Sequence, residues 1–247
     1  MAIVLPTVKT VPTTSWERQT FLTLGPGKVG KSDFWSQGDK TLFLEFEAGL
    51  NHLTCYRIPV RAWEEFIEVL GELYKAQKAG SFPYDTLVID TVDRMIDLAN
   101  EYVIERAKEK FKADIASKIE TIGDIPNGAG WYQATNLVRI TLEKMRQFPA
   151  ALVLIGHTKM DRRKEGVREY NKETINIGGQ AGTSLLHWAD HTLHWRARMR
   201  GDQVERCLRT KPSEELEAGS RGNMVPDGFR IDGSMKESYG KFRALFS

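Results

Sequence analysis

An apolar segment followed at once by a glycine-rich loop is the feature that most constrains this chain. Residues 19–24 have the apolar pattern of a strand, and the next eight residues have the spacing G-x-x-x-x-G-K-[ST]. In such a loop, backbone N–H groups surround the phosphates of a nucleotide, the lysine contacts the β- and γ-phosphates, and the hydroxyl binds Mg²⁺. We therefore predict a site for ATP and Mg²⁺, with Ser32 as a metal ligand, formed by Gly25, Pro26, Gly27, Lys28, Val29, Gly30, Lys31 and Ser32.

The chain from residue 33 to residue 155 alternates between strand and helix patterns. Mainly apolar runs, typical of strands covered on both faces, occur at residues 41–46, 84–90 and 151–155. A short helix fits at 33–37, and apolar residues spaced by three and four predict helices at 61–79, about 92–112 and 131–148. Trp131 belongs to the apolar face predicted for the last of these. This order predicts an α/β fold with a right-handed, mainly parallel sheet flanked by helices.

The chain from residue 161 onward has a different pattern. Residues 161–182 are polar and glycine-rich, and this length without a clear element predicts a mobile functional loop. Residues 191–199 and 203–211 predict a hairpin that turns at 200–202 and forms the antiparallel end of the same sheet. Proline and threonine near the start predict an extended tail over residues 1–14, so residues 15–247 are expected to form one domain.

Composition adds limits rather than a function. A net charge of +2 is too small to indicate a nucleic-acid partner by itself. The two cysteines suit free thiols in a reducing compartment, and the set His187, His191, His194 and Cys207 fits no common zinc spacing. The sequence has no apolar run long enough for a membrane span and no secretion signal, so we expect a cytoplasmic protein.

One carboxylate is expected beside the glycine-rich loop. Asp90 ends the apolar run 87–89, which places it at the carboxyl end of a central strand, where an acid can hold Mg²⁺ through water. A capping role for the helix that starts at Val92 is the alternative for Asp90, although Asp93 suits that helix terminus better.

Segments spread over residues 16–221 resemble the RecA-like ATPases encoded by bacteriophages, which include recombinases and single-strand-annealing proteins. The resemblance lies in the loop 25–32, in 43–50 and 87–91, in Gly130-Trp131 before a helix, in Gly156-His157, and in 208–213. It implies a RecA-like P-loop core and hydrolysis of ATP. Among Glu45, Glu47 and Asp90 at strand ends, it favours Glu47 as the residue that activates water, although an exposed acid at a strand end is the plain alternative.

The resemblance also implies roles near the γ-phosphate. His157 stands where RecA-like proteins place a polar sensor, often glutamine, although a structural histidine fits too. Arg209 and Lys211, predicted on one strand face, are similar to basic residues that RecA-like subunits insert into a neighbour's ATP site. Arg221 is a second candidate, and a solvated strand end is the plain alternative for the pair. This interpretation implies a homo-oligomer, a filament or a ring, with ATP between subunits.

The polar segment after the sensor strand is where RecA-like proteins bind DNA. Basic side chains suit phosphates and a tyrosine suits stacking on a base, so single-stranded DNA is the expected partner, although a plain surface loop has similar composition. The candidate residues are Arg162, Arg163, Lys164, Arg168, Tyr170 and Lys172. Two functions stay open: a DNA-binding recombination, annealing or repair protein, and a RecA-like motor or regulatory ATPase without that activity.

Overall fold

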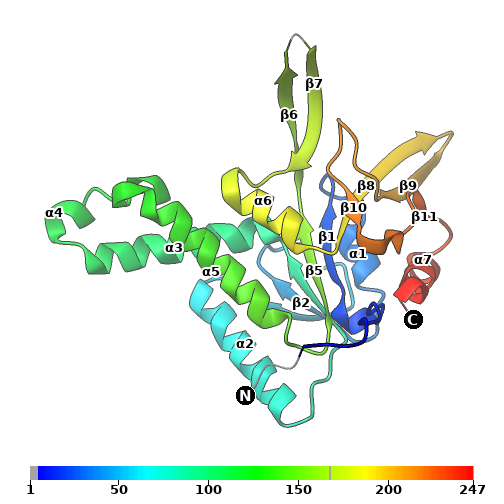
Figure 1. Cartoon of the computed structure of the whole chain (residues 1–247), viewed down its shortest axis with the longest axis horizontal. Helices are drawn as coiled ribbons and strands as arrows, with labels where there is room; N and C mark the ends of the chain where they lie inside the picture. Colours follow the sequence, from blue (N-terminus) through cyan, green and yellow to red (C-terminus); the bar gives the residue numbers. More distant parts are fainter. Residues whose placement is uncertain (1–4, 167, 247) are drawn as a thin grey trace.

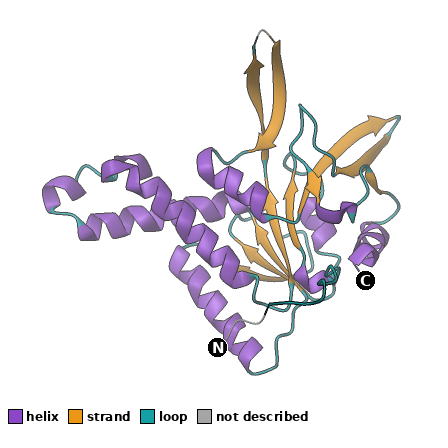
Figure 2. Cartoon of the chain, in the orientation of Figure 1, coloured by secondary structure: helices purple, strands orange, loops and turns teal. Residues whose placement is uncertain are grey.

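The apolar runs predicted as strands form the centre of one nine-stranded sheet (Figures 1 and 2). The computed structural model describes residues 5–166 and 168–246. The strand order is β11-β9-β8-β1-β5-β4-β2-β3, with β10 paired to β8. The strands are β1 (Thr20–Leu24), β2 (Thr41–Glu45), β3 (Tyr56–Pro59), β4 (Thr86–Asp90), β5 (Ala151–Gly156), β8 (His191–Arg200), β9 (Gln203–Arg209), β10 (Gly219–Ser220) and β11 (Phe229–Ile231).

The sheet is parallel from β3 to β8 and antiparallel beyond it. Strands β1, β2, β4 and β5 pair in parallel, and β8 pairs in parallel with β1. Strand β9 then pairs antiparallel with β8, and β11 with β9. The predicted α/β class and the predicted β8–β9 hairpin at one end of the sheet are therefore confirmed. This is the arrangement that the resemblance to RecA-like ATPases implied.

Helices cover both faces of the sheet, as nearly continuous apolar strands require. Leu22 and Leu24 of β1 pack with buried residues from the helices on one face, whereas Phe21 packs on the opposite face. The first face is covered by α2 (Trp63–Lys78), α3 (Val92–Lys110), α5 (Ala129–Met145) and α6 (Gly179–Trp188). The other is covered by α1 (Lys31–Trp35) and α7 (Met235–Arg243).

Beyond the sheet, α3 and α5 continue into a projection that also contains α4 (Ala113–Ala116) (Figure 1). Two short 3-10 helices, η2 (Ile122–Asp124) and η3 (Pro126–Gly128), lie between α4 and α5. Others lie elsewhere in the described chain: η1 (Trp16–Arg18), η4 (Arg221–Asn223) and η5 (Ala244–Phe246). Val103, Ala107 and Ala134 pack with isoleucines of the connecting segment, so the projection has its own small apolar core.

The polar segment predicted as a mobile loop is a β-hairpin, so that prediction is wrong. Strands β6 (Thr158–Glu165) and β7 (Arg168–Ile175) pair antiparallel, and the hairpin projects from the molecule (Figure 1). Helix α6 begins at Gly179, inside the range predicted as loop. The strand pattern was hidden because both faces of the hairpin are largely exposed, so charged residues occupy successive positions instead of alternating with apolar ones.

An aromatic cluster joins the start of the described chain to its end. The rings of Trp16 and Phe21 contact those of Phe242 and Phe246 at centroid distances of 5.3 to 6.3 Å. Helix α7 brings Phe242 there, and its first turn is held by a capping box between Ser234 and Glu237. The C-terminal helix therefore completes the core on the α1 face.

Residues 1–4 of the predicted N-terminal tail lie outside the described part, and residues 5–15 contain no helix or strand. Among the described helices, none combines the length and apolar character that crossing a membrane requires.

Candidate functional site

The parallel strands bring the predicted nucleotide residues to one edge of the sheet. The glycine-rich loop follows β1, Glu47 follows β2, Asp90 ends β4 and His157 follows β5. Because β1, β5, β4 and β2 are neighbours and run in the same direction, their carboxyl ends converge. Residues predicted separately from four segments therefore form one site.

The glycine-rich loop joins β1 to α1, as its chemistry requires. Gly30 has φ 104°, a left-handed conformation that favours glycine, and α1 begins at the next residue. The Lys31 side chain is buried and its Nζ donates to the carbonyl oxygens of Gly25 and Pro26, both at 2.8 Å. Burial lowers the pKa of Lys31 to about 8, against the opposing charge of nearby carboxylates, first of all Asp90. The lysine is thus held inside the loop that would surround phosphates.

Ser32 and Asp90 face each other across the loop. The Ser32 hydroxyl donates to the Asp90 carboxylate at 2.6 Å. Burial raises the pKa of Asp90, while the hydrogen bond from Ser32 and the charge of Lys31 act in the opposite direction. A hydroxyl and a carboxylate are the hard oxygen ligands that Mg²⁺ takes, so these two residues fit a magnesium site.

Two glutamates near the end of β2 have different environments. Glu45 is 4% exposed, and its Oε1 accepts from the backbone N–H groups of Gly49 and Leu50, both at 3.4 Å. Glu47 is exposed, and its Oε2 accepts from the Thr91 hydroxyl at 3.2 Å, next to Asp90. Glu45 therefore braces the loop after β2, whereas Glu47 is free to contact solvent beside the metal candidate.

His157 is held by Asp93, the acid expected at the helix terminus. The Asp93 carboxylate accepts from the His157 backbone N–H at 3.0 Å, and its Oδ2 lies 3.5 Å from His157 Nδ1. The hydrogen bond with Asp93 raises the pKa of His157, and burial opposes that effect. Thr91 is the N-cap of α3 and its hydroxyl accepts from the Arg94 N–H at 3.4 Å, while Asp93 lies in the first turn.

Arg206 is a neighbour of the loop that the sequence interpretation missed. Its Nε donates to the Val29 carbonyl oxygen at 3.0 Å, and Gly30 lies beside the same side chain. The two residues are 177 positions apart, so no local pattern could indicate this contact. It arises because β9 passes close to the loop in the folded sheet.

Of the basic residues expected to act on a neighbour's ATP site, two contact carboxylates of their own chain. The Arg209 Nε donates to Asp227 at 3.0 Å, and β9 ends at Arg209, so Lys211 lies outside the strand. The argument that one strand aligns both side chains on the same face is therefore wrong. Lys211 itself is exposed. Arg221, the second candidate, pairs with Asp190 at 2.9 Å.

The six residues expected to bind DNA all lie on the β6–β7 hairpin. In its register, Arg163 lies opposite Tyr170 and Arg162 opposite Asn171, so Arg162 and Arg163 are on different faces. Several of the cations have acidic neighbours: Arg162 pairs with Glu169, Arg163 with Asp161, Arg168 with Glu214 and Lys172 with Glu217. Lys164 is exposed and has no ion pair within the described residues.

The histidines considered for zinc have other surroundings. The His191 ring lies between Gln19 Oε1 at 3.0 Å and Ser220 Oγ at 2.9 Å, and burial lowers its pKa to about 4. His194 Nε2 lies 3.5 Å from Glu173, and burial lowers its pKa to about 4 as well. Both rings are therefore neutral groups of the sheet.

Comparison with known families decides the classification. A family model described as an AAA domain matches residues 17–222. The chain belongs to this AAA domain family. The match contains the whole nucleotide site, from the loop after β1 to His157 and β9, and ends before α7.

Individual relatives of this AAA domain protein are distant. It is 26% identical over 141 residues to a SPbeta prophage-derived uncharacterized protein, YorG, of Bacillus subtilis (strain 168). That alignment covers 56% of this chain and 41% of the relative, so the chain spans less than half of the relative's length. A solved RadB recombinase structure is similar at 15% identity and a TM-score of 0.39, over 87% of each chain.

Proposed function

We propose that this AAA domain protein is a Mg²⁺-dependent ATPase that binds single-stranded DNA and acts in phage-type recombination, annealing or repair. Three features support the hydrolytic part: buried Lys31 inside the loop, the Ser32–Asp90 pair at 2.6 Å, and Glu47 exposed beside that pair. The prophage origin of the Bacillus relative supports the biological setting, with host cytoplasm as the location.

The nucleotide site suggests a division of roles. The loop residues and Lys31 would hold the triphosphate of ATP, and Ser32 and Asp90 would hold Mg²⁺. When bound, Mg²⁺ supplies charge stabilisation on the phosphate oxygens. Glu47 would accept a proton from the attacking water, since its carboxylate is exposed and tied only to the Thr91 hydroxyl among the described residues. His157, positioned by Asp93, would donate to the phosphate that leaves.

The position of the β6–β7 hairpin is the observation that supports the proposed binding of single-stranded DNA. Strand β6 begins at Thr158, directly after His157, so the hairpin starts where the nucleotide site ends. Residues 158–175 contain six basic and four acidic side chains, a net charge of +2, and include Tyr170. One acid, Glu173, is buried at the base, where it accepts from the Thr158 hydroxyl at 2.8 Å and pairs with Arg196. Without Glu173 the net charge of this range is +3, although Glu214 and Glu217 from outside the range pair with Arg168 and Lys172.

Binding of single-stranded DNA tests this proposal directly. Fluorescence anisotropy at low salt, with ATP and Mg²⁺, should show binding that weakens as salt rises, because phosphate contacts release counterions. Replacing Arg162, Arg163 and Lys164 together with alanine should weaken binding and flatten its salt dependence while leaving ATP affinity unchanged.

A matched control removes the same charge elsewhere. Lys40, Lys75 and Lys78 are exposed, and α2, which carries the last two, lies far from the hairpin (Figure 1). Their triple alanine variant should bind DNA like the wild type. If the wild type shows no binding of single-stranded DNA, the protein is instead a motor or regulatory ATPase whose hairpin contacts protein.

A further inference from the structure

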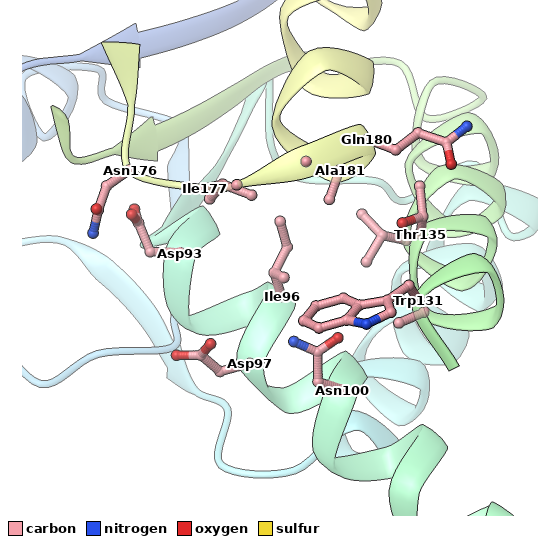
Figure 3. Close-up of a pocket in the computed structure, with 14 residues that line it drawn as sticks. Asp93, Ile96, Asp97, Asn100, Trp131, Thr135, Asn176, Ile177, Gln180 and Ala181 are labelled. Carbon is pink, nitrogen blue, oxygen red and sulfur yellow. The ribbon is translucent and has the colours of Figure 1, made fainter. Parts of the chain in front are cut away.

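A cavity of about 610 Å³ lies between α3, α5 and the loop that joins β7 to α6 (Figure 3). Ile96, Val138 and Ala181 give it apolar walls, and Trp131 projects into it from the first turn of α5. The cavity is separate from the loop 25–32. It shares one wall residue, Asp93, with the nucleotide site.

Trp131 is exposed where the sequence predicted a packed residue. Its exposed fraction is 58%, whereas each of the other five tryptophans is at most 9% exposed. Gly130 explains the position of this turn, because a Cβ there would lie 2.3 Å from the Ile122 carbonyl oxygen. The backbone is thus packed tightly against the preceding segment while the indole is left outside. Within the described residues, no ring or cation stacks on it.

The rim of the cavity is polar. The side-chain amides of Asn100, Asn176 and Gln180 line it and have no hydrogen-bond partner within residues 5–166 and 168–246. Amides both donate and accept, so together with the apolar walls they suit a flat group that has polar edges. Asp93 and Asp97 add carboxylates to the wall, which disfavour an anionic group inside the cavity.

We propose that this cavity receives one base of bound single-stranded DNA, stacked on Trp131, while the phosphates follow the basic β6–β7 hairpin. The inference rests on the proposed function and assigns it a subsite. The lip formed by residues 176–179 continues directly from β7, so a strand attracted by the hairpin reaches the cavity. The acidic wall excludes phosphate and accepts an uncharged base. Asp93 would then link base binding to His157, because it lines the cavity and holds that histidine.

The test separates base contacts from backbone contacts. Two probes of equal length are used, a thymidine oligonucleotide and an abasic deoxyribose-phosphate oligomer, with Mg²⁺ and a non-hydrolysable ATP analogue. The base-bearing probe should quench the fluorescence of the one exposed tryptophan, whereas the abasic probe should bind without quenching. Trp131→Ala should weaken binding of the base-bearing probe about ten-fold, the scale of one lost base–aromatic stack, and leave the abasic probe unaffected.

Tyr132→Ala is the matched control. Tyr132 is the next residue of α5, is 67% exposed and does not line the cavity, so its loss should change neither affinity. Equal binding of both probes by wild type and Trp131→Ala would overturn the base subsite and leave DNA binding intact. A similar loss in Tyr132→Ala, or tryptophan quenching that follows protein concentration without DNA, would also overturn it. No binding of either probe to the wild type would overturn the proposed function together with the subsite.

Discussion

At the scale of single residues, Glu45 and Glu47 are the clearest contrast. Glu47→Gln should keep nucleotide binding but lower ATP hydrolysis by on the order of 10² or more, the scale of losing a positioned general base. Glu45→Gln should remain close to wild type, since a glutamine oxygen can still accept from the backbone N–H groups that Glu45 now binds. Steady-state turnover and binding of a fluorescent ATP analogue distinguish the two variants. The reverse ranking would show that Glu45 is the catalytic carboxylate.

Lys31 makes the binding of ATP depend on pH. Its pKa is about 8 because the side chain is buried, so it is mostly protonated at pH 7 and increasingly neutral above pH 8. The phosphates need the charged form, so ATP affinity should fall as pH rises from 7.5 to 9, and binding near pH 8.5 should take up a proton. Calorimetry in two buffers with different ionisation enthalpies measures that uptake. Lys31→Ala should show weak binding without proton uptake; unchanged ATP turnover in that variant would contradict the site itself.

At the scale of elements, the register of the hairpin separates its basic residues into two faces. Arg163 and Tyr170 are cross-strand partners on one face, where the Arg168 guanidinium lies 6.0 Å from the Tyr170 ring. Arg162 and Lys164 lie on the other face. If single-stranded DNA stacks on the tyrosine face, Arg163→Ala with Tyr170→Ala should weaken binding more than Arg162→Ala with Lys164→Ala, although the second pair removes more charge. Dissociation constants from anisotropy decide this, and the opposite order would assign DNA to the Arg162 face.

The sequence predicted best the elements whose pattern is local and apolar. The central strands and α3 were recognisable because each is an uninterrupted apolar run or a helical stripe. The hairpin β6–β7 was missed because exposure on both faces removes alternation, and β11 and α7 were missed because three and nine residues are too short for a clear pattern. Trp131 was assigned to a core from its spacing alone, since spacing defines a helix face but not what covers it.

The same limit applies to the site. The loop 25–32, Asp90, Glu47 and His157 could be predicted to lie together because each ends or follows a strand pattern, and parallel strands bring such positions to one edge of the sheet. Arg206 and the Asp93–His157 contact depend on tertiary packing, which no short motif encodes. Strand patterns alone did not separate Glu47 from Glu45, which lie two positions apart at the end of β2; the resemblance favoured Glu47, and the structure adds that Glu45 is buried whereas Glu47 is exposed.

At the scale of the whole molecule, the resemblance to RecA-like ATPases predicts an assembly with ATP between subunits. If Lys211 acts on a neighbouring site, a mixture of Lys211→Ala and Lys31→Ala subunits should recover turnover that neither variant shows alone, because some mixed interfaces contain both lysines. Turnover of the mixture, with co-assembly verified by size-exclusion chromatography, measures this. An inactive mixture that does co-assemble would show that Lys211 has no role in trans.

The aromatic cluster that joins Trp16 and Phe21 to Phe242 and Phe246 also has a consequence for the timing of folding. During synthesis, α2, α3 and α5 of one layer are complete before residue 150 has been added, and α6 of the same layer follows at residues 179–188. The opposite layer is complete only after residues 235–246 have been added, although Trp16 and Phe21 of the same layer are synthesised more than 200 residues earlier. On the ribosome, Trp16 and Phe21 therefore remain without these partners until residues 235–246 have been added, and the folding of α7 closes the layer that packs behind the nucleotide loop.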